Sequence, residues 1–289
     1  MISGRSDGKA MMNDIRMVAI DLDGTLLTDE KKILEEDRKA ISEARRNGCR
    51  IVLCSGRTRS IMVDYIRDLG FDQEGEYTIE SNGGSICDEG TQKSIYSMCL
   101  SPESVRQILQ IARENDNLVN PQMYLEGKLL VDHYVAATEM YEKLSGNKAH
   151  VVPDLADLCD EPMQKIVFCS HMGVPEKDLQ QLQKRVEEVL PEDVAVWQSA
   201  SFLLDFVSKN GGKWNAVRWL SNYLNIPTTS IMCIGDQEND AEMIKEAGIG
   251  ACPANASEAA KSVADIVAEN SNNKCAVAEI LKKAGLCRL

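Results

Sequence analysis

Two aspartates separated by one residue are the clearest candidates for chemistry in this chain. Asp21 and Asp23 lie in the run Asp-Leu-Asp-Gly-Thr, directly after an apolar stretch at residues 17–20. Side chains two residues apart on an extended segment point the same way, roughly 7 Å apart. Two such carboxylates can share a hard cation, or one can attack while the other moves protons. A plain strand-end turn also favours Asp and Gly, but chance rarely places this whole pattern after a strand.

A second acidic run follows another apolar stretch and opens a predicted helix. It reads Gly-Asp-Gln-Glu-Asn-Asp and occupies residues 235–240. Asp236 is placed to join a metal site, and Asn239 or Asp240 could orient that metal or bind phosphate. Acidic residues at a helix start are also ordinary caps. This run therefore indicates a metal or phosphate site only in combination with the run that contains Asp21 and Asp23.

Two shorter signals suit a phosphate group. Ser55-Gly56-Arg57 follows a third apolar stretch and offers a hydroxyl and backbone N–H groups at a strand-to-helix turn. Lys213 follows two glycines at a predicted helix start, where its charge could neutralise phosphate and carboxylates together. A plain turn and a surface lysine are the ordinary alternatives for these two signals taken alone.

The elements that must position these residues alternate between buried strands and helices. Apolar runs at 17–20, 51–54, 77–79 and 231–234 predict strands, and helices are predicted at 34–47, 59–69, 212–224, 241–246 and 275–283. This alternation is typical of an α/β fold with a Rossmann-like parallel-sheet core. Ligands bind at the carboxyl ends of the strands in such sheets, so Asp21, Ser55 and Asp236 should meet at one edge.

The middle of the chain has a different pattern. Its helices, at 101–114 and 175–190, are more polar, and its strands, at 165–169 and 194–198, alternate more. We therefore predict an α+β domain inserted at residues 86–207. The catalytic core would comprise residues 15–85 and 208–289, after a flexible N-terminal stretch at residues 1–14.

The composition excludes several classes of function. A net charge of -13 over 289 residues would repel nucleic acid and anionic membrane surfaces. The three histidines do not have the spacing of metal ligands. The 10 cysteines form no Cys-x-x-Cys pair, and this pattern is typical of buried free thiols. With no apolar run of membrane-span length and no secretory signal pattern, we expect a cytoplasmic protein.

Taken together, these motifs resemble the haloacid dehalogenase (HAD) superfamily, specifically its Cof-like phosphatases with a large α/β cap domain. The resemblance covers nearly the whole chain after residue 14. The motifs that carry it occur in the family's order: residues 21–26, 55–57, Lys213 and residues 235–240. An Asn-Gly pair at residues 82–83 and an Asn-Ala pair at residues 255–256 also match the family.

The resemblance implies a role for each matched residue. Asp21 would be the nucleophile, Asp23 the general acid and base, and Lys213 the third catalytic residue. Mg²⁺ would be held by Asp21, by the backbone carbonyl of Asp23 and by Asp236. The phosphate would contact Leu22, Ser55, Gly56, Arg57 and Asn239. The chain departs from the family in the glycines before Lys213 and in Cys-Pro-Ala at residues 252–254, although neither change removes a reacting group.

The expected function is therefore a magnesium-dependent phosphatase acting on a small phosphate ester through an aspartyl-phosphate intermediate. The family suggests sugar phosphates, pyridoxal phosphate or flavin mononucleotide as the substrate class, and no motif in the inserted domain selects among them. Two alternatives share the core: a phosphomutase, and a ligand-binding protein that has lost catalysis. Release of free phosphate without a bisphosphate primer separates the phosphatase from the mutase, and the intact set of reacting groups disfavours the binding protein.

Overall fold

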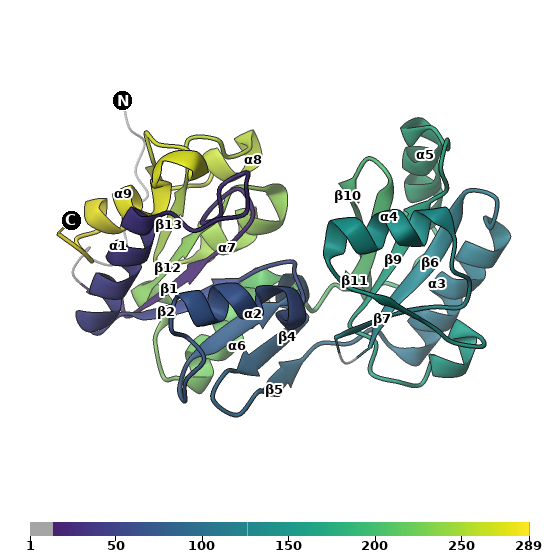
Figure 1. Cartoon of the computed structure of the whole chain (residues 1–289), viewed down its shortest axis with the longest axis horizontal. Helices are drawn as coiled ribbons and strands as arrows, with labels where there is room; N and C mark the ends of the chain where they lie inside the picture. Colours follow the sequence, from purple (N-terminus) through teal and green to yellow (C-terminus); the bar gives the residue numbers. More distant parts are fainter. Residues whose placement is uncertain (1–13, 126, 289) are drawn as a thin grey trace. The chain divides into compact units, whose positions relative to one another are not determined.

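The chain folds into two compact units, described here from a computed structural model (Figure 1). The structure describes residues 14–125 and 127–288. The core unit comprises the chain up to Gly56, Val63–Ile95 and the chain from Lys213 onward, and the second unit comprises Arg57–Met62 and Tyr96–Gly212. The predicted flexible stretch at residues 1–14 lies outside the described residues except for residue 14. The mixed α/β class predicted from the sequence is confirmed.

An eight-stranded sheet forms the centre of the core unit. From β14 to β3 neighbouring strands are parallel, and β4 then returns antiparallel to β3. Their order across the sheet is β14 (Ile266–Val267), β13 (Ile249–Cys252), β12 (Ile231–Ile234), β1 (Met17–Ile20), β2 (Arg50–Cys54), β3 (Tyr77–Glu80), β4 (Ser85–Asp88) and β5 (Lys93–Ser97).

Helices cover this sheet because its central strands have no polar face. Every residue of β1, β12 and β13 is buried, as expected for parallel strands with helices on both sides. The core contains the helices α1 (Glu35–Arg46), α6 (Lys213–Tyr223), α7 (Ala241–Glu246), α8 (Glu258–Lys261) and α9 (Ala276–Lys283). Helix α2 (Arg59–Asp68) belongs to the core from Val63 onward, and its first turn is grouped with the second unit. Helices α1 and α9 lie side by side, and α6 contacts α7 (Figure 1).

The second unit has its own sheet and two apolar cores. Its strands run in the order β10 (Val194–Ala200), β11 (Leu203–Ser208), β9 (Lys165–Ser170), β6 (Val119–Leu125), β7 (Lys128–Val131) and β8 (Ala149–Val151). Helices α3 (Pro102–Glu114) and α5 (Glu176–Glu187) pack on one face, where Ile166 and Phe168 point. Helix α4 (Ala136–Ser145) packs on Val167 and Cys169, which alternate to the other face.

The boundaries of the inserted segment differ from the prediction at 86 and 207. Strands β4 and β5 belong to the core sheet, so the chain enters the second unit at Tyr96 and leaves it at Gly212. The reason is local: Asn82 adopts a left-handed backbone with φ 57° and turns β3 back into β4. The alternating pattern of residues 85–97 therefore marks an antiparallel extension of the core sheet, whereas the prediction assigned it to the inserted domain.

Two further findings concern the cysteines and the membrane. All ten cysteines are free, and all except Cys99 and Cys275 are buried, as the sequence predicts for packed thiols. No helix in the described part of the chain is long and apolar enough to cross a membrane.

Candidate active site

The candidate site lies at the carboxyl edge of the core sheet, where separate segments end side by side. Strand β1 pairs in parallel with β12 on one side and β2 on the other, so Asp21, Asp236 and Ser55 follow three adjacent strand ends. The backbone N–H of Asp21 continues the ladder by donating to the carbonyl of Ile234 at 2.9 Å. The sequence therefore predicted this convergence correctly.

Lys213 is the electrostatic centre of the site. Its ammonium donates to Asp21 Oδ1 at 2.6 Å and to Asp240 Oδ1 at 2.5 Å, and its side chain is 1% exposed. Helix α6 begins at Lys213, so the first turn of this helix delivers the charge to the strand ends. A buried ammonium is stable only when anions surround it, and here two carboxylates do so.

Backbone and side-chain donors hold the two carboxylates contributed by the β12 loop. Asp240 Oδ2 accepts from the backbone N–H groups of Asp236 and Gln237 at 3.0 and 3.1 Å. Asp236 in turn accepts from the Thr25 hydroxyl at 3.1 Å and from the Gln237 amide at 2.9 Å. Gly24 makes the close approach possible, since a Cβ there would stand 2.3 Å from Asp236 Oδ2.

Burial dominates the electrostatics of this cluster. It raises the pKa of Asp21 above the ordinary value, against the opposing attraction of Lys213, and it also raises the pKa of Asp236. Burial by itself would lower the pKa of Lys213, but Asp21 and Asp240 outweigh that effect and raise it. The lysine is therefore held charged, while the raised pKa values of Asp21 and Asp236 show that one lysine does not stabilise the ionised form of all three carboxylates.

The ratio of three buried carboxylates to one lysine fits a divalent cation. Asp21, Asp236 and Asp240 are buried, and each offers an oxygen within 4.8 Å of the others. Carboxylate oxygens are the ligands that Mg²⁺ prefers. The predicted metal set contained Asp21, Asp23 and Asp236, and the cluster brings together the first and last of these side chains. The third carboxylate is that of Asp240, which the sequence suggested only as an alternative to Asn239.

Asp23 points to a different partner. Its carboxylate accepts from Lys31 Nζ at 2.6 Å, and its side chain is 39% exposed whereas Asp21 is buried. The two aspartates, two residues apart, thus occupy different environments: one sits among buried charges and the other faces solvent. A contact of the Asp23 backbone carbonyl with a metal stays a prediction.

The remaining predicted phosphate contacts lie around the end of β2. Ser55 is buried, and its carbonyl accepts from the backbone N–H of Asn82 at 3.0 Å. Asn239 donates from its side-chain amide to the side chain of Asn82 at 2.9 Å, which links the loops after β3 and β12. A Cβ on Gly56 would stand 2.9 Å from Asn82 Oδ1, so any other residue here would have to displace the Asn82 amide.

Two predicted phosphate contacts stay predictions for different reasons. Leu22 follows Asp21 directly and is buried, so only its backbone N–H is suited to a phosphate oxygen. Arg57 is grouped with the second unit and not with the core. Its part in phosphate binding stays a prediction.

Sequence reasoning assigned no role to several residues that build the site. Thr25 lies in the first motif, where its hydroxyl positions Asp236. Asn255 donates to the carbonyl of Gly24 at 2.8 Å and accepts from the backbone N–H of Asn272, which secures the loop after β1. Asn255 belongs to the Asn-Ala pair at residues 255–256, and its match to the family was the available signal.

Comparisons with known proteins are consistent along the chain. A family model described as haloacid dehalogenase-like hydrolase matches residues 18–281. The chain is 28% identical over 295 residues to phosphatase YwpJ of Bacillus subtilis, covering 93% of this chain and 99% of that protein. It is 27% identical over 267 residues to the 5-amino-6-(5-phospho-D-ribitylamino)uracil phosphatase YcsE of Bacillus subtilis, covering 89% and 91%.

A solved structure is also similar to this chain over nearly its whole length. The crystal structure of TM0651 from Thermotoga maritima superposes with a TM-score of 0.82 at 28% identity, covering 93% of this chain and 97% of that one. The similarity therefore extends over both units of the fold.

Proposed function

Since the chain belongs to the haloacid dehalogenase-like hydrolases and is a phosphatase, we propose that it hydrolyses a small phosphorylated metabolite through an aspartyl phosphate on Asp21 in a magnesium-dependent reaction. The observation that carries the proposal is the bridge from Lys213 to Asp21 and Asp240. It fixes one oxygen of Asp21 against a cation and leaves the carboxylate at the edge of the sheet where ligands bind.

The chemistry requires a nucleophile that stays charged near an anionic substrate. Burial raises the pKa of Asp21, so positive charge is needed to keep it ionised, and Lys213 supplies part of that charge. Held by Asp21, Asp236 and Asp240, Mg²⁺ would supply the rest and offset the repulsion between carboxylate and phosphate. Lys213 would also stabilise the negative charge on the transferring phosphoryl oxygens.

The proposed reaction then has two steps carried by the two aspartates. One oxygen of Asp21 attacks phosphorus, the P–O bond to the leaving group breaks, and Asp23 gives its proton to the departing alkoxide. Asp23, now a carboxylate, takes a proton from water, whose oxygen attacks the phosphorus of the aspartyl phosphate. Free phosphate leaves and both aspartates return to their starting states. The exposed position of Asp23 suits exchange of protons with solvent.

The substrate class is proposed from the relatives and from the family. Proteins named 5-amino-6-(5-phospho-D-ribitylamino)uracil phosphatase occur among the relatives in Bacillus subtilis and Escherichia coli. We therefore place that flavin precursor first among the candidates, beside sugar phosphates, pyridoxal phosphate and flavin mononucleotide. We also propose that the second unit is the cap that recognises the leaving group.

Phosphate release tests this function directly. Each candidate ester is incubated with the full chain and Mg²⁺, and inorganic phosphate is measured with and without excess chelator. We expect release from at least one ester, none in chelator and none from Asp21→Asn. Full activity in chelator would contradict the metal scheme. Activity that appears only after a bisphosphate primer is added would indicate a phosphomutase.

A further inference from the structure

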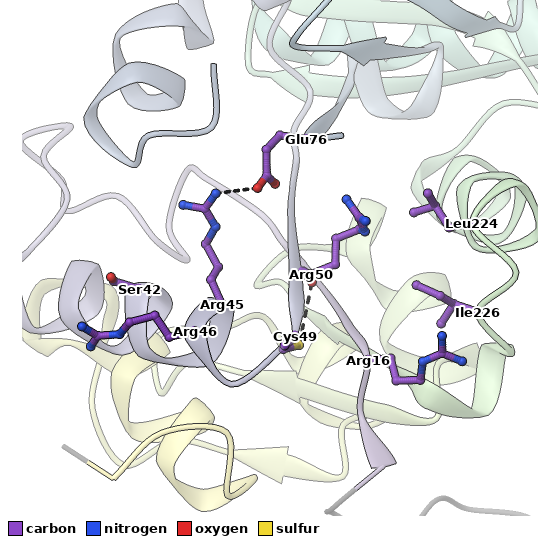
Figure 2. A pocket seen from close by; sticks show the side chains of 10 residues that line it. Arg16, Ser42, Arg45, Arg46, Cys49, Arg50, Glu76, Leu224 and Ile226 are labelled. Carbon is purple, nitrogen blue, oxygen red and sulfur yellow. Dashed lines mark hydrogen bonds and ion pairs between the residues drawn. The ribbon is translucent and has the colours of Figure 1, made fainter. Parts of the chain in front are cut away.

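A second hollow on the core unit lies at the opposite edge of the sheet. It has a volume of about 500 Å³ and is lined by Arg16, Arg45, Arg46 and Arg50, with Glu76 as its acidic residue (Figure 2). This volume falls within the usual range for a small-molecule site. A concentration of arginines is unexpected in a chain whose net charge is -13.

The hollow is separate from the candidate active site. Arg16 directly precedes β1 and Asp21 directly follows it, while Arg50 opens β2 and Ser55 follows that strand. Five residues of extended strand span roughly 16 Å. The same two strands therefore carry the arginines at their amino ends and the candidate catalytic residues at their carboxyl ends.

Arg45 has a structural explanation. It donates to Glu76 at 2.5 Å and to the carbonyls of Leu69 and Gly70, and its guanidinium lies 4.6 Å from the centre of the Phe71 ring. These bonds connect the end of α1 to the loop after α2. The charge of Arg45 is offset by Glu76, so it adds little to the attraction for an anion.

The other three arginines have no carboxylate partner among the residues that the structure describes. Arg50 donates to the carbonyl of Gly75, a neutral acceptor that fixes its position without offsetting its charge. No ion pair involving Arg16 or Arg46 occurs in the described part of the chain. Arg46 lies in the last turn of α1, where the helix dipole stabilises a positive charge. The dipole does not explain the positions of Arg16 and Arg50, which lie outside this helix.

Two of these three arginines lie on the same side of the hollow as its apolar lining residues. In Figure 2 the guanidinium groups of Arg16 and Arg50 lie towards Leu224 and Ile226, whereas Arg46 lies on the other side near Ser42. Two uncompensated guanidiniums beside two apolar side chains suit a ligand that has both an anionic and an apolar part. Arginine is also the side chain best shaped to bind phosphate with two parallel hydrogen bonds.

Aromatic rings adjoin this same side. The Arg50 guanidinium lies 5.7 Å from the centre of the Tyr77 ring, and Tyr77 meets Tyr223 edge-on at 6.1 Å. Tyr223 stacks on Trp219 at 5.3 Å with an interplanar angle of 11°. Tyr223 is 52% exposed and directly precedes Leu224 of the lining. The exposed Tyr223 ring, already held by stacking and flanked by arginines, can stack against a planar nucleobase. Proteins that bind single-stranded nucleic acids use aromatic side chains in the same way.

We propose that this hollow binds a nucleoside diphosphate or triphosphate, with the phosphates at Arg16 and Arg50 and the base against Tyr223. A free nucleotide fits better than a nucleic acid, because the field of a chain with net charge -13 repels a long polyanion while a small ligand meets mainly the local cations. The site is independent of the proposed hydrolysis, since none of its residues belongs to the candidate active site.

Calorimetric titration with a non-hydrolysable triphosphate, the β,γ-imido analogue of ATP, tests the proposal. Chelator in the buffer suppresses metal-dependent binding at the candidate active site, and Lys213→Met removes the lysine there. We expect saturable binding that Lys213→Met leaves unchanged and that Arg16→Ala weakens by about tenfold, as loss of a charge-assisted phosphate contact predicts. Arg16→Glu should abolish it. Arg16 makes no side-chain bond within the described residues, so these variants should fold.

Two further arms test the parts of the assignment. Lys39→Ala removes the same charge from the exposed side of α1, outside the hollow, and should leave the affinity within about twofold. Tyr223→Ala should weaken the nucleotide by about fivefold or more and leave inorganic tripolyphosphate unaffected. No binding to the wild-type chain, or equal binding to wild type and Arg16→Glu, would overturn the site. Equal affinity for tripolyphosphate and nucleotide would overturn the role of the base.

Discussion

Each unit of this protein buries a lysine against aspartate, and the two clusters are built differently. In the core, Lys213 meets Asp21 and Asp240, which come from segments far apart in the sequence. In the second unit, Lys165 of β9 meets Asp205 of the adjacent strand β11 at 2.7 Å. Both lysines are nearly inaccessible, so the difference between the clusters lies in the balance of charge around them.

The second-unit pair is neutral, whereas the core cluster is not. Three buried carboxylates, those of Asp21, Asp236 and Asp240, surround the one ammonium of the core cluster, and burial raises the pKa of the first two. The isolated pair of Lys165 and Asp205 is neutral in charge, although Asp205 Oδ1 is buried without a hydrogen-bond partner in the described structure. An unbalanced cluster at a strand edge is instead suited to bind something, which is how buried charge can mark a functional site.

The largest expected difference between the clusters is in catalysis. Lys213→Met should lower kcat by about a thousandfold or more, because the variant removes the ammonium that offsets Asp21 and Asp240 and that would stabilise the transferring phosphoryl oxygens. Lys165→Met should leave kcat within about threefold once the protein is folded, because its pair is neutral and lies in the second unit, outside the candidate active site. Steady-state phosphate release at a temperature where both variants are folded makes the comparison. Equal losses in the two variants would remove the functional distinction.

The second-unit pair should instead show its effect in stability. Removing one partner leaves the other buried and uncompensated, so Lys165→Met should lower the free energy of unfolding by about 3–5 kcal/mol. The double variant Lys165→Met/Asp205→Leu should recover most of this loss, because it leaves no unpaired charge. Urea unfolding of the wild type, both single variants and the double variant measures the coupling. Additive losses would show that the two side chains do not depend on each other.

Asp37 offers a third case, a buried carboxylate without a cation. It lies on α1, its Oδ1 accepts from the backbone N–H of Ala278 at 2.8 Å, and its Oδ2 has no partner in the described structure. Burial raises the pKa of Asp37 from 3.8 to about 6. The folded state therefore holds this proton more tightly than the unfolded chain, and the stability from this group is lost as the pH rises from about 4 to about 6.

Asp37→Asn should remove that pH dependence. Relative to wild type, the variant should gain up to about 3 kcal/mol in free energy of unfolding between pH 4 and pH 7, the product of the shift and 1.36 kcal/mol per pKa unit. The measurement is urea unfolding at several pH values, with Glu35→Gln as a control that removes an exposed carboxylate from the same helix. A difference between wild type and Asp37→Asn that does not change with pH would contradict the raised pKa.

The core cluster was largely predictable, because its residues follow strands. Apolar runs ending at Asp21, Ser55 and Asp236 predict parallel strands, and parallel strands bring their carboxyl ends to one edge. What the sequence could not fix was the choice between Asn239 and Asp240. That choice depends on which way a short 3₁₀ turn, Glu238–Asp240, directs each side chain, and Lys213 from a remote helix decides it.

The second unit was less predictable for a physical reason. Its sheet is antiparallel except for the parallel pair β7 and β8, and helices cover both of its faces. Strand β9 is therefore buried throughout, and the alternation expected at residues 165–169 does not separate a buried face from an exposed one. Strand β11 is buried throughout, yet it carries Asp205, a residue that disfavours strands. Its partner Lys165 lies on another strand, and no local pattern in the sequence connects the two.

The smallest effect we predict concerns the residue that positions a ligand of the proposed metal. The Thr25 hydroxyl donates to Asp236 Oδ1 at 3.1 Å, and both side chains are buried. Thr25→Val keeps the shape and the β-branch but removes this donor, so the carboxylate loses one of the bonds that orient it. Loss of such a supporting bond typically weakens metal affinity by about 10–100-fold. We expect the Mg²⁺ concentration for half-maximal activity to rise by that factor, with kcat at saturating Mg²⁺ nearly unchanged.

Thr28→Val is the matched control for this last change. Thr28 is also buried in the segment after β1, but its hydroxyl accepts from the backbone N–H of Lys32 and makes no hydrogen bond to the clustered carboxylates in the described structure. Its variant should therefore leave the Mg²⁺ dependence within about twofold while sharing any general cost of placing valine in this segment. Equal shifts in the two variants would assign the effect to local packing. A shift confined to Thr25→Val would show that the unbalanced core cluster depends on its oriented carboxylates, which the neutral pair of the second unit does not require.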